Sequence, residues 1–494
     1  MTTPHVTTTP HVTMAAHVTT TPHLTAAIAR FIATLRYDDI PLAARTPIHV
    51  AFADTIGVTI AGANEDAPRL VAAMLGSSGD EALLLGGAGL RASALDAAWI
   101  NGTAAHALDY DDVSQRGCHA SASIVPAILA EAEAVAATGA QMIAAYAAGY
   151  ETIAELARRD ADVGRYHDKG WHPTGFFGAI AAAAACASLR GLDAGQCATA
   201  LGIAASQAAG LIANVGTMTK PLHAGRAAHA GVASARLAAA GFTAAGDVFD
   251  HVPGFLQAYS FGGRIDLESP AAIGDRWQIC DGNRISVKKY PMCFCTHRAI
   301  DGMFDLLDAH PLVADDIDRI EVTISRRNLV ILRNHRPQTG LEAKFSIEFA
   351  LAAPVIARKA GLSELTDAFV LRPDVQAVMR RVVVKPEDRD DPHRPGYAVA
   401  DRVVVFDGTG NAHDSGPIVH VRGDHDSPLT RDALRAKFED CSAFGDPAID
   451  ARSLFDMLMD LGNVARAVDL VDALSTPLLR QRPPLPVSIS RARP

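Results

Sequence analysis

Apolar residues recur at helical spacing over most of residues 25–280. The stretch EAEAVAATGAQMIAAYAAGYETIAELARR combines strong helix formers with apolar positions three or four residues apart, and Gly, Pro and Asp residues separate it from its neighbours. Many of the apolar residues are alanine, and with glycine they let helices pack closely. This part of the chain is therefore predicted to form a large helical domain.

The pattern changes near residue 285. Runs of β-branched residues at 319–327, 380–388 and 401–421 predict strands, and the last run predicts a hairpin with DGTG at its turn. Helical patterns lie between these runs, at 296–309 and 344–359. Alternating strands and helices of this kind indicate a smaller α/β domain.

A helical pattern returns after Pro428, in TRDALRAKFEDC and SLFDMLMDLG. The simplest arrangement has this segment rejoin the first domain. We therefore predict a mainly α fold, with a large all-helical domain built from both chain ends and an inserted smaller α/β lid domain. Because ligands often bind at domain interfaces, we expect a ligand between the two domains. The predicted ranges are 1–24 for a low-complexity leader, 25–285 for the first helical part, 286–424 for the lid, 425–480 for the closing helical segment and 481–494 for a tail.

The leader places a histidine at every sixth position, at residues 5, 11, 17 and 23. A metal-binding tail is one interpretation of this repeat. A disordered leader, or translation that begins at Met14 or later, is the other, because segments rich in Pro and Thr bury little surface.

Composition narrows the class of partner. The formal charge of −10 over 494 residues argues against nucleic acid as the main partner, and the apolar runs are too short or too broken to span a membrane. The seven cysteines include no CxxC pair, so we expect reduced thiols in a cytoplasmic protein, with no metal and no cofactor.

The stretch ALDYDDVSQRGCHASAS places three carboxylates, Asp109, Asp111 and Asp112, ahead of His119. Asp111 and Asp112 fit solvated or capping positions near a helix end. A divalent metal needs more oxygen ligands than this stretch alone supplies. A DxDD motif also occurs in protonating terpene cyclases, but their aromatic cavities fit poorly with 6% aromatic residues. Asp109 is the candidate working carboxylate of this stretch, and the family resemblance given below implies that it is paired with His119.

Two further stretches carry cationic or titratable side chains. KGWHPTGFFG holds His172 at the start of an apolar helix, where the helix dipole favours a neutral imidazole or a bound anion. GTMTKPLHAGRAAHAG adds Lys220, His223 and Arg226 at a glycine-punctuated helix start, a pattern typical of a carboxylate or phosphate clamp. Each stretch taken alone fits a structural role equally well.

The stretch VKKYPMCFCTHRAIDG places Lys288, Cys293, Cys295 and His297 at the junction between the two predicted domains. Together with the three stretches before it, this predicts a site for a small polycarboxylate, with lysines for binding and with histidines and Asp109 for proton transfer.

These stretches, together with TGLEAKFSIEFALA, resemble the MmgE/PrpD family of 2-methylcitrate dehydratases, cis-aconitate decarboxylases and an iminodisuccinate epimerase. The resemblance is collinear over about 25–475. It implies a helical domain formed by both chain ends, a smaller α/β lid, a homodimer, and action on small di- or tricarboxylates without an iron–sulfur cluster.

By motif, the resemblance implies active-site roles for Asp109, His119, His172, Lys220 and Lys288. We expect the two lysines to neutralise substrate carboxylates, His172 or His119 to transfer protons, and Asp109 to orient a histidine.

The other candidate binding residues are His223, Arg226, Cys293 and His297. Cys293 stands where cis-aconitate decarboxylases of the animal type carry a histidine.

Dehydration of a hydroxy acid like 2-methylcitrate is the favoured activity. Epimerisation of iminodisuccinate and decarboxylation of cis-aconitate are alternatives, and a ligand-binding protein without catalysis is a further one.

Overall fold

The computed structural model describes residues 24–76, 79–87, 89–114, 117–392 and 398–475. The predicted leader, apart from Leu24, and the predicted tail lie outside these residues. Within the described part of the chain, no helix is both long and apolar enough to cross a bilayer.

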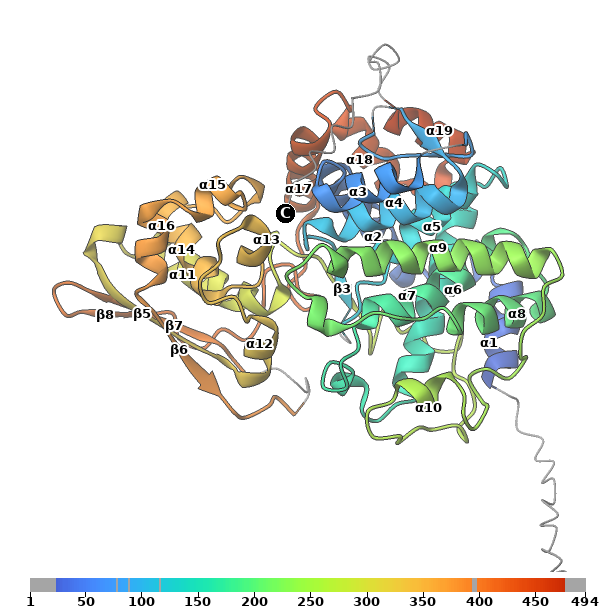
Figure 1. The fold of residues 1–494 in the computed structure, drawn as a ribbon, viewed down its shortest axis with the longest axis horizontal. Coiled ribbons are helices and arrows are strands. Elements are labelled where there is room, and N and C mark those ends of the chain that lie inside the picture. The colour runs from blue at the N-terminus through green and yellow to red at the C-terminus, as the bar shows by residue number, and fades with distance from the viewer. Residues whose placement is uncertain (1–23, 77–78, 88, 115–116, 393–397, 476–494) are drawn as a thin grey trace, which may run out of the picture.

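In the described part of the helical domain, helices α1 to α10 come first, and α7 and α9 make the most extensive helix–helix contacts among them (Figure 1). Alanine-rich α7 is buried on almost every side, which explains its lack of an amphipathic pattern. The helices are α1 (Leu24–Thr34), α2 (Leu42–Gly62), α3 (Asp66–Leu75), α4 (Ala94–Ala107), α5 (Ser121–Ala132), α6 (Gly139–Arg158), α7 (Pro173–Leu189), α8 (Ala194–Ala205), α9 (Thr219–Ala239) and α10 (Phe255–Tyr259). A short antiparallel pair, β1 (Ala82–Leu83) and β2 (Arg91–Ala92), precedes α4.

The lid is a separate α/β body with its own hydrophobic core. Its sheet has the order β6-β5-β7-β8, in which β5 and β6 are parallel and the other pairs are antiparallel. The predicted hairpin is the β7–β8 pair. The lid elements are α11 (His297–Ala309), β5 (Ile317–Ser325), α12 (Arg326–Ile331), α13 (Gly340–Ala343), α14 (Ile347–Ala357), α15 (Asp367–Val370), α16 (Pro373–Met379), β6 (Val382–Glu387), β7 (Arg402–Asp407) and β8 (Ala412–Asp414).

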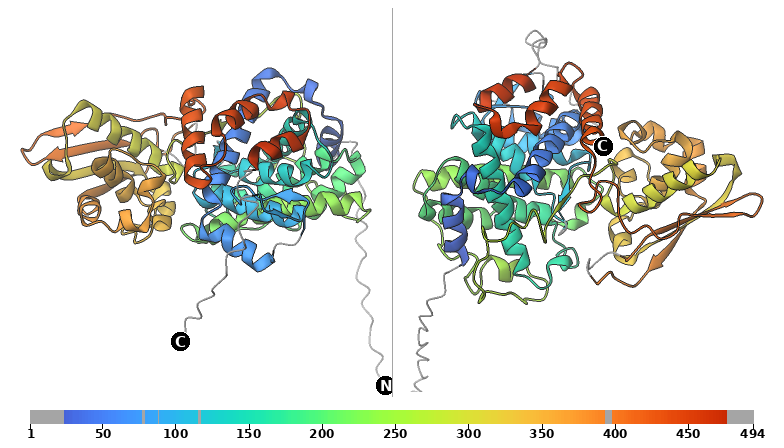
Figure 2. Two further views of the ribbon diagram at one scale, coloured as in Figure 1. Left: turned by 90° about the horizontal axis from the view of Figure 1, so that it is seen from above. Right: turned by 180° about the vertical axis from the view of Figure 1, so that it is seen from behind.

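The closing helices return to the helical domain, as Figure 2 shows from two further sides. They are α17 (Arg431–Gly445), α18 (Ala451–Met459) and α19 (Ala467–Leu474), and α17 packs along α2. The predicted fold class, mainly α with an inserted α/β lid, is confirmed. At the junction, β3 (Val113–Ser114) of the helical domain pairs with β4 (Ile285–Ser286), where the chain passes toward the lid.

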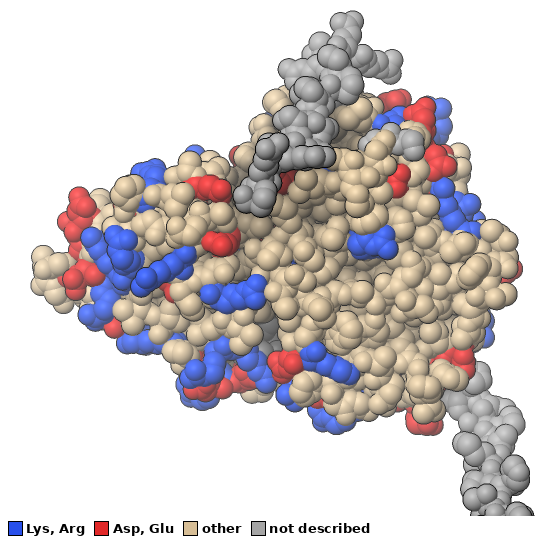
Figure 3. Space-filling model, viewed as in Figure 1, with Lys and Arg blue, Asp and Glu red and all other residues tan. Residues whose placement is uncertain are grey.

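Charged side chains are unevenly spread over the surface. In the view of Figure 3, Lys, Arg, Asp and Glu crowd the lid, whereas the face over α9 carries few of them.

The predicted homodimer stays a prediction.

Helices α4 and α9 approach so closely that two glycines meet. A Cβ added at Gly102 would lie 2.8 Å from the Cα of Gly225, and a Cβ at Gly225 would lie 2.2 Å from Thr103 Oγ1. Because α4 carries His106 and α9 carries Lys220, this contact also fixes the distance between two polar side chains described below.

We expect Gly225→Ala to lower the free energy of unfolding by about 1–3 kcal/mol, because overpacking outweighs the roughly 1 kcal/mol that alanine gains as a helix former. Chemical denaturation measures this. Gly195→Ala in α8 is the control, since its added Cβ would meet only Asp193 Oδ1, at 3.3 Å. Equal stability of the two variants would contradict the close packing.

Candidate active site

A cluster of buried titratable side chains lies where the two domains join. Its members come from the end of α4 and the loop after it, the segment before α5, the starts of α7 and α9, and the segment after β4 that leads into the lid. They are His106, Asp109, Asp111, His119, His172, Lys220, His223 and Lys288.

Asp109 binds the two predicted lysines. Its Oδ1 lies 2.6 Å from Lys220 Nζ and 3.1 Å from Lys288 Nζ, and Lys288 also donates to the Asp109 main-chain oxygen at 2.6 Å. The residue has φ of 51°, a left-handed conformation that Asp tolerates better than most residues. Burial alone would raise the pKa of Asp109, but the two ammonium groups hold it far below its usual range.

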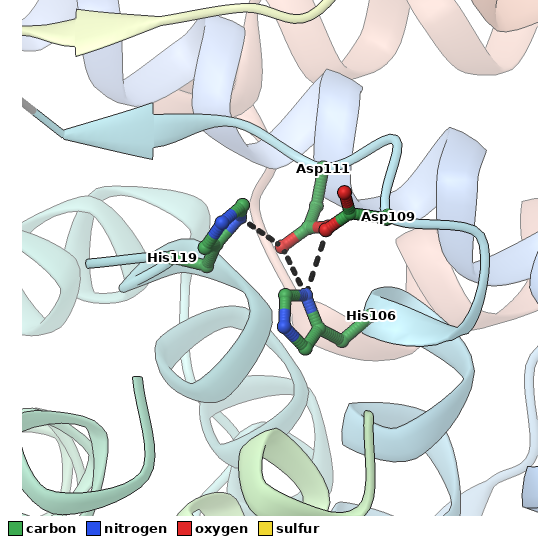
Figure 4. Close-up of side chains that lie close together, drawn as sticks. All are labelled: His106, Asp109, Asp111 and His119. Carbon is green, nitrogen blue, oxygen red and sulfur yellow. Dashed lines mark hydrogen bonds and ion pairs between the residues drawn. The ribbon is translucent and has the colours of Figure 1, made fainter. Parts of the chain in front are cut away.

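Asp111 binds two histidines, as Figure 4 shows. His106 Nδ1 lies 2.9 Å from Asp111 Oδ2, and His119 Nδ1 lies 3.0 Å from the same oxygen. The expected pairing of Asp109 with His119 is therefore wrong. The solvated position considered for Asp111 is wrong as well, because its side chain is fully buried.

Asp112 is buried too, and accepts a hydrogen bond of 2.6 Å from Ser121 Oγ. The solvated or capping position considered for Asp112 is therefore also wrong. Burial, with the nearby charge of Asp54, raises the pKa of Asp112 well above its usual value.

The contacts of His106 fix its tautomer. Lys220 Nζ lies 2.8 Å from His106 Nε2, and an ammonium can only donate, so Nε2 accepts and the ring proton lies on Nδ1, facing Asp111. Burial lowers the pKa of His106 to about 3, against the attraction of Asp111, so the ring is neutral. His106 is a site residue that was not predicted, although it lies directly before the quoted stretch ALDYDDVSQRGCHASAS and five residues before Asp111.

His119 has the contact typical of a proton-transfer histidine. Its Nδ1 faces the Asp111 carboxylate, which places the proton on Nδ1 and leaves Nε2 as the basic nitrogen. No hydrogen bond to Nε2 occurs among the described residues. Burial lowers the pKa of His119.

His172 stands at the N-cap of α7, as its sequence predicts, with Pro173 at the first helical position. Its Nδ1 lies 3.0 Å from His223 Nδ1, so one ring donates to the other. Burial and the charge of Lys220 lower the pKa of both histidines, that of His223 to about 4.

Two further buried lysines support the cluster. Lys344 of the lid donates to the Ala107 main-chain oxygen at 2.9 Å. Lys437 of α17 donates to the main-chain oxygens of Tyr110 and Lys288, each at 2.8 Å, and lies 2.6 Å from Asp54 Oδ1. Neither lysine was predicted as a site residue: Lys344 lies in TGLEAKFSIEFALA, quoted for the family resemblance, and Lys437 lies in TRDALRAKFEDC, quoted for its helical pattern.

No hydrogen bond joins Arg226 or His297 to the cluster within the described residues, although burial and the charge of Lys288 lower the pKa of His297. Six residues after Lys220, Arg226 lies about 240° around α9, is exposed, and stacks over Trp99 at 4.3 Å. His297 is fully buried in the lid, with Nε2 3.2 Å from the Met292 main-chain oxygen.

Cys293 is buried beside the junction, and its main-chain N–H donates to the Lys344 oxygen at 2.9 Å. The neighbouring thiol of Cys295 lowers the pKa of Cys293.

A cavity of about 760 Å³ lies between the domains and borders the cluster. Val113 and Pro173 line it, directly after Asp112 and His172 in the chain, and Cys295 lines it from the lid. Its volume falls within the range of small-molecule sites. None of the eight cluster residues lines the cavity itself, but chain neighbours of several of them do, so the cavity lies beside the cluster at the domain junction.

The ligand atoms of His106, Asp109, Asp111 and His119 lie within 4.8 Å of one another, close enough to share a metal ion. Two ammonium groups already contact Asp109, however, and both histidines direct Nδ1 to Asp111. The positive charge that a metal would supply is thus provided by Lys220 and Lys288.

The chain belongs to the MmgE/PrpD family. The model of the MmgE/PrpD N-terminal domain matches residues 26–268, and that of the C-terminal domain matches residues 290–456. The chain is 27% identical to cis-aconitate decarboxylase of Mus musculus over 352 residues, which cover 69% of this chain and 70% of that protein. It is 24% identical to cis-aconitate decarboxylase of Aspergillus terreus over 482 residues, which cover 92% and 96%.

The neutral state of buried His106 predicts an acid-sensitive fold. Because its pKa is 6.5 when unfolded and about 3 when folded, the unfolded chain binds more protons and stability falls as the pH drops below 6.5. Between pH 7 and 5 this amounts to roughly 2 kcal/mol.

We expect His106→Asn to flatten the pH dependence of the free energy of unfolding, measured by chemical denaturation at pH 7 and 5. Buried acids such as Glu151, whose pKa burial raises to about 7, act in the opposite direction, so only the difference between variants is informative. His251→Asn, at an exposed histidine, is the control. If the free energy of unfolding of His106→Asn changed with pH as much as that of the unaltered protein, the neutral state of His106 would be refuted.

Proposed function

We propose that this protein is a lyase that acts on a small tricarboxylate by moving a proton at a carbon next to a carboxylate. The observation that carries the proposal is the pair of buried ammonium groups at Asp109, adjacent to a histidine oriented by Asp111. The decarboxylase relatives support the same class of reaction.

The two lysines neutralise negative charge on the substrate. Lys220 and Lys288 already face one carboxylate, so their positions suit a carboxylate of the substrate that approaches from the cavity. When a proton leaves the neighbouring carbon, negative charge spreads onto that carboxylate as an enediolate. Preorganised ammonium groups in a buried site stabilise this charge without reorganisation.

We assign the two proton transfers to different histidines. His119, with its proton on Nδ1 toward Asp111, removes the carbon-bound proton through Nε2. The bound tricarboxylate favours the protonated form of His172, which donates its Nε2 proton to the departing hydroxyl and keeps its Nδ1 proton, facing His223 Nδ1. The C–O bond breaks as the double bond forms, and the hydroxyl leaves as water.

Dehydration of a hydroxy acid like 2-methylcitrate uses both histidines and is our first assignment. Decarboxylation of cis-aconitate is the second, favoured by the relatives. Against it stands Cys293, at the position of a histidine in the animal-type decarboxylases. His297 does not replace that histidine, because its Nε2 is bonded within the lid.

Proton NMR of the pure enzyme with 2-methylcitrate, citrate, cis-aconitate or iminodisuccinate tests the assignment. We expect dehydration of citrate to give a vinylic proton signal, and dehydration of 2-methylcitrate at its methyl-bearing carbon to turn the methyl doublet into an allylic methyl singlet. Loss of carbon dioxide from cis-aconitate would instead establish the second assignment, and inversion of iminodisuccinate would establish an epimerase. No turnover of any of the four would overturn the proposal.

The orienting role of Asp111 predicts a selective loss of kcat. We expect Asp111→Asn to lower kcat about 100-fold or more with little change in KM, because an amide no longer holds His119 in the productive tautomer. Steady-state kinetics measures this.

Asp112→Asn is the matched control. Burial raises the pKa of this neighbouring carboxyl well above its usual value, so the amide resembles its protonated form and activity should be nearly unchanged. If both variants lost kcat equally, Asp111 would have no special role.

A further inference from the structure

The lid side of the cavity carries a buried arginine and a buried carboxyl that the proposed reaction does not use. Arg298 lies on α11 and is 5% exposed, and Asp401 precedes β7 and is 2% exposed. Both line the cavity, together with Phe294 and Cys295. Charged side chains are rarely buried to this degree unless they are paired.

Arg298 has more hydrogen-bond donors than partners. Its Nη1 donates to the Ala398 main-chain oxygen at 2.7 Å and lies 3.9 Å from Asp401 Oδ1, too far for a hydrogen bond. A guanidinium has five N–H donors. No other hydrogen bond from this side chain occurs within the described residues, so the cavity is where its remaining donors can find acceptors.

Asp401 is equally short of partners. Among the described residues its carboxyl accepts no hydrogen bond, and Oδ1 is a buried atom without one. Burial raises the pKa of Asp401 to about 7, against the charge of Arg298. A buried acceptor left unsatisfied is costly, and such groups in native proteins usually have a functional reason.

The other arginines of the cavity wall have closer partners. Arg333 donates to the main-chain oxygens of Ala213 and Val215, at 3.1 and 2.6 Å. Arg284 lies 2.9 Å from Asp426, and Arg327 lies 3.4 Å from Asp390. Arg298 is thus the best-placed of them to bind an incoming anion.

We propose that Arg298 and Asp401 form a second polar site in the cavity, which binds a substrate carboxylate with a hydroxyl or amine donor beside it. Arg298 takes the carboxylate, and Asp401 accepts the hydrogen bond of the neighbouring donor. This inference rests on the proposed function, since it concerns the same substrate.

The site has a consequence for substrate choice. A hydroxy acid satisfies both Arg298 and Asp401, whereas cis-aconitate has carboxylates but no hydroxyl or amine donor. An acid without the donor leaves the Asp401 carboxyl desolvated and unpaired, which is how buried polar groups discriminate between ligands. The site therefore selects hydroxy or amino acids over unsaturated acids of the same size.

Citrate and tricarballylate test this, because they differ only in the hydroxyl group. We expect isothermal titration calorimetry to show citrate binding about tenfold or more tightly than tricarballylate. Asp401→Leu, which keeps the volume and removes the acceptor, should abolish the preference. Arg298→Gln should weaken both ligands about tenfold or more, and Arg327→Gln, on the same wall, should change neither.

Thermal melting establishes that each variant is folded. If Asp401→Leu does not fold, Asp401→Asn replaces it, and this variant should reduce the preference for citrate. An unchanged preference in the Asp401 variant, or unchanged affinities in Arg298→Gln, would overturn the second site. Equal affinity of the unaltered enzyme for both acids would also overturn it, while turnover in the NMR experiment would leave the proposed function standing. An enzyme that neither binds nor converts any of these acids would overturn both.

Discussion

The arrangement of the site depends on one carboxylate, that of Asp109, which must neutralise two ammonium groups in a place with almost no water. Lys220 comes from α9 and Lys288 from the segment after β4 that leads into the lid, so this contact holds the domain junction against the helical domain. Removing one partner of such a buried pair typically costs about 3–5 kcal/mol, because the other charge is left uncompensated. A bound substrate carboxylate would meet lysines already held in place.

The neighbouring groups divide the work between charge and proton transfer. Asp111 holds two neutral histidines, whereas Asp112, the next residue, accepts from Ser121 and takes no part in the histidine network. Asp109, two residues before Asp111, has a left-handed backbone and binds the two lysines instead of the histidines. Such conformations persist where the surrounding structure enforces them, and they concentrate at functional sites.

Periodicity predicted the domains well because each depends on a repeated local pattern. The helical domain, the strands β5, β6 and β7, and the return of the closing helices all follow from spacing along the chain. The motifs brought Asp109, Lys220 and Lys288 together, but the partners of each carboxylate could not be predicted. The pairing depends on a loop with a positive φ, and His106 was missed because its partner lies in that loop.

Lys437 links this site to the order in which the chain is made. Asp54 lies in α2, near the start of the chain, yet its ammonium partner is in α17, near the end. While a ribosome is still producing the lid, α2 must carry a carboxyl without its counter-charge, and the carbonyls of Tyr110 and Lys288 lack their donor. Domains usually form as they are synthesised. Here the first helices can assemble early, but a competent site can arise only after nearly the whole polypeptide has emerged.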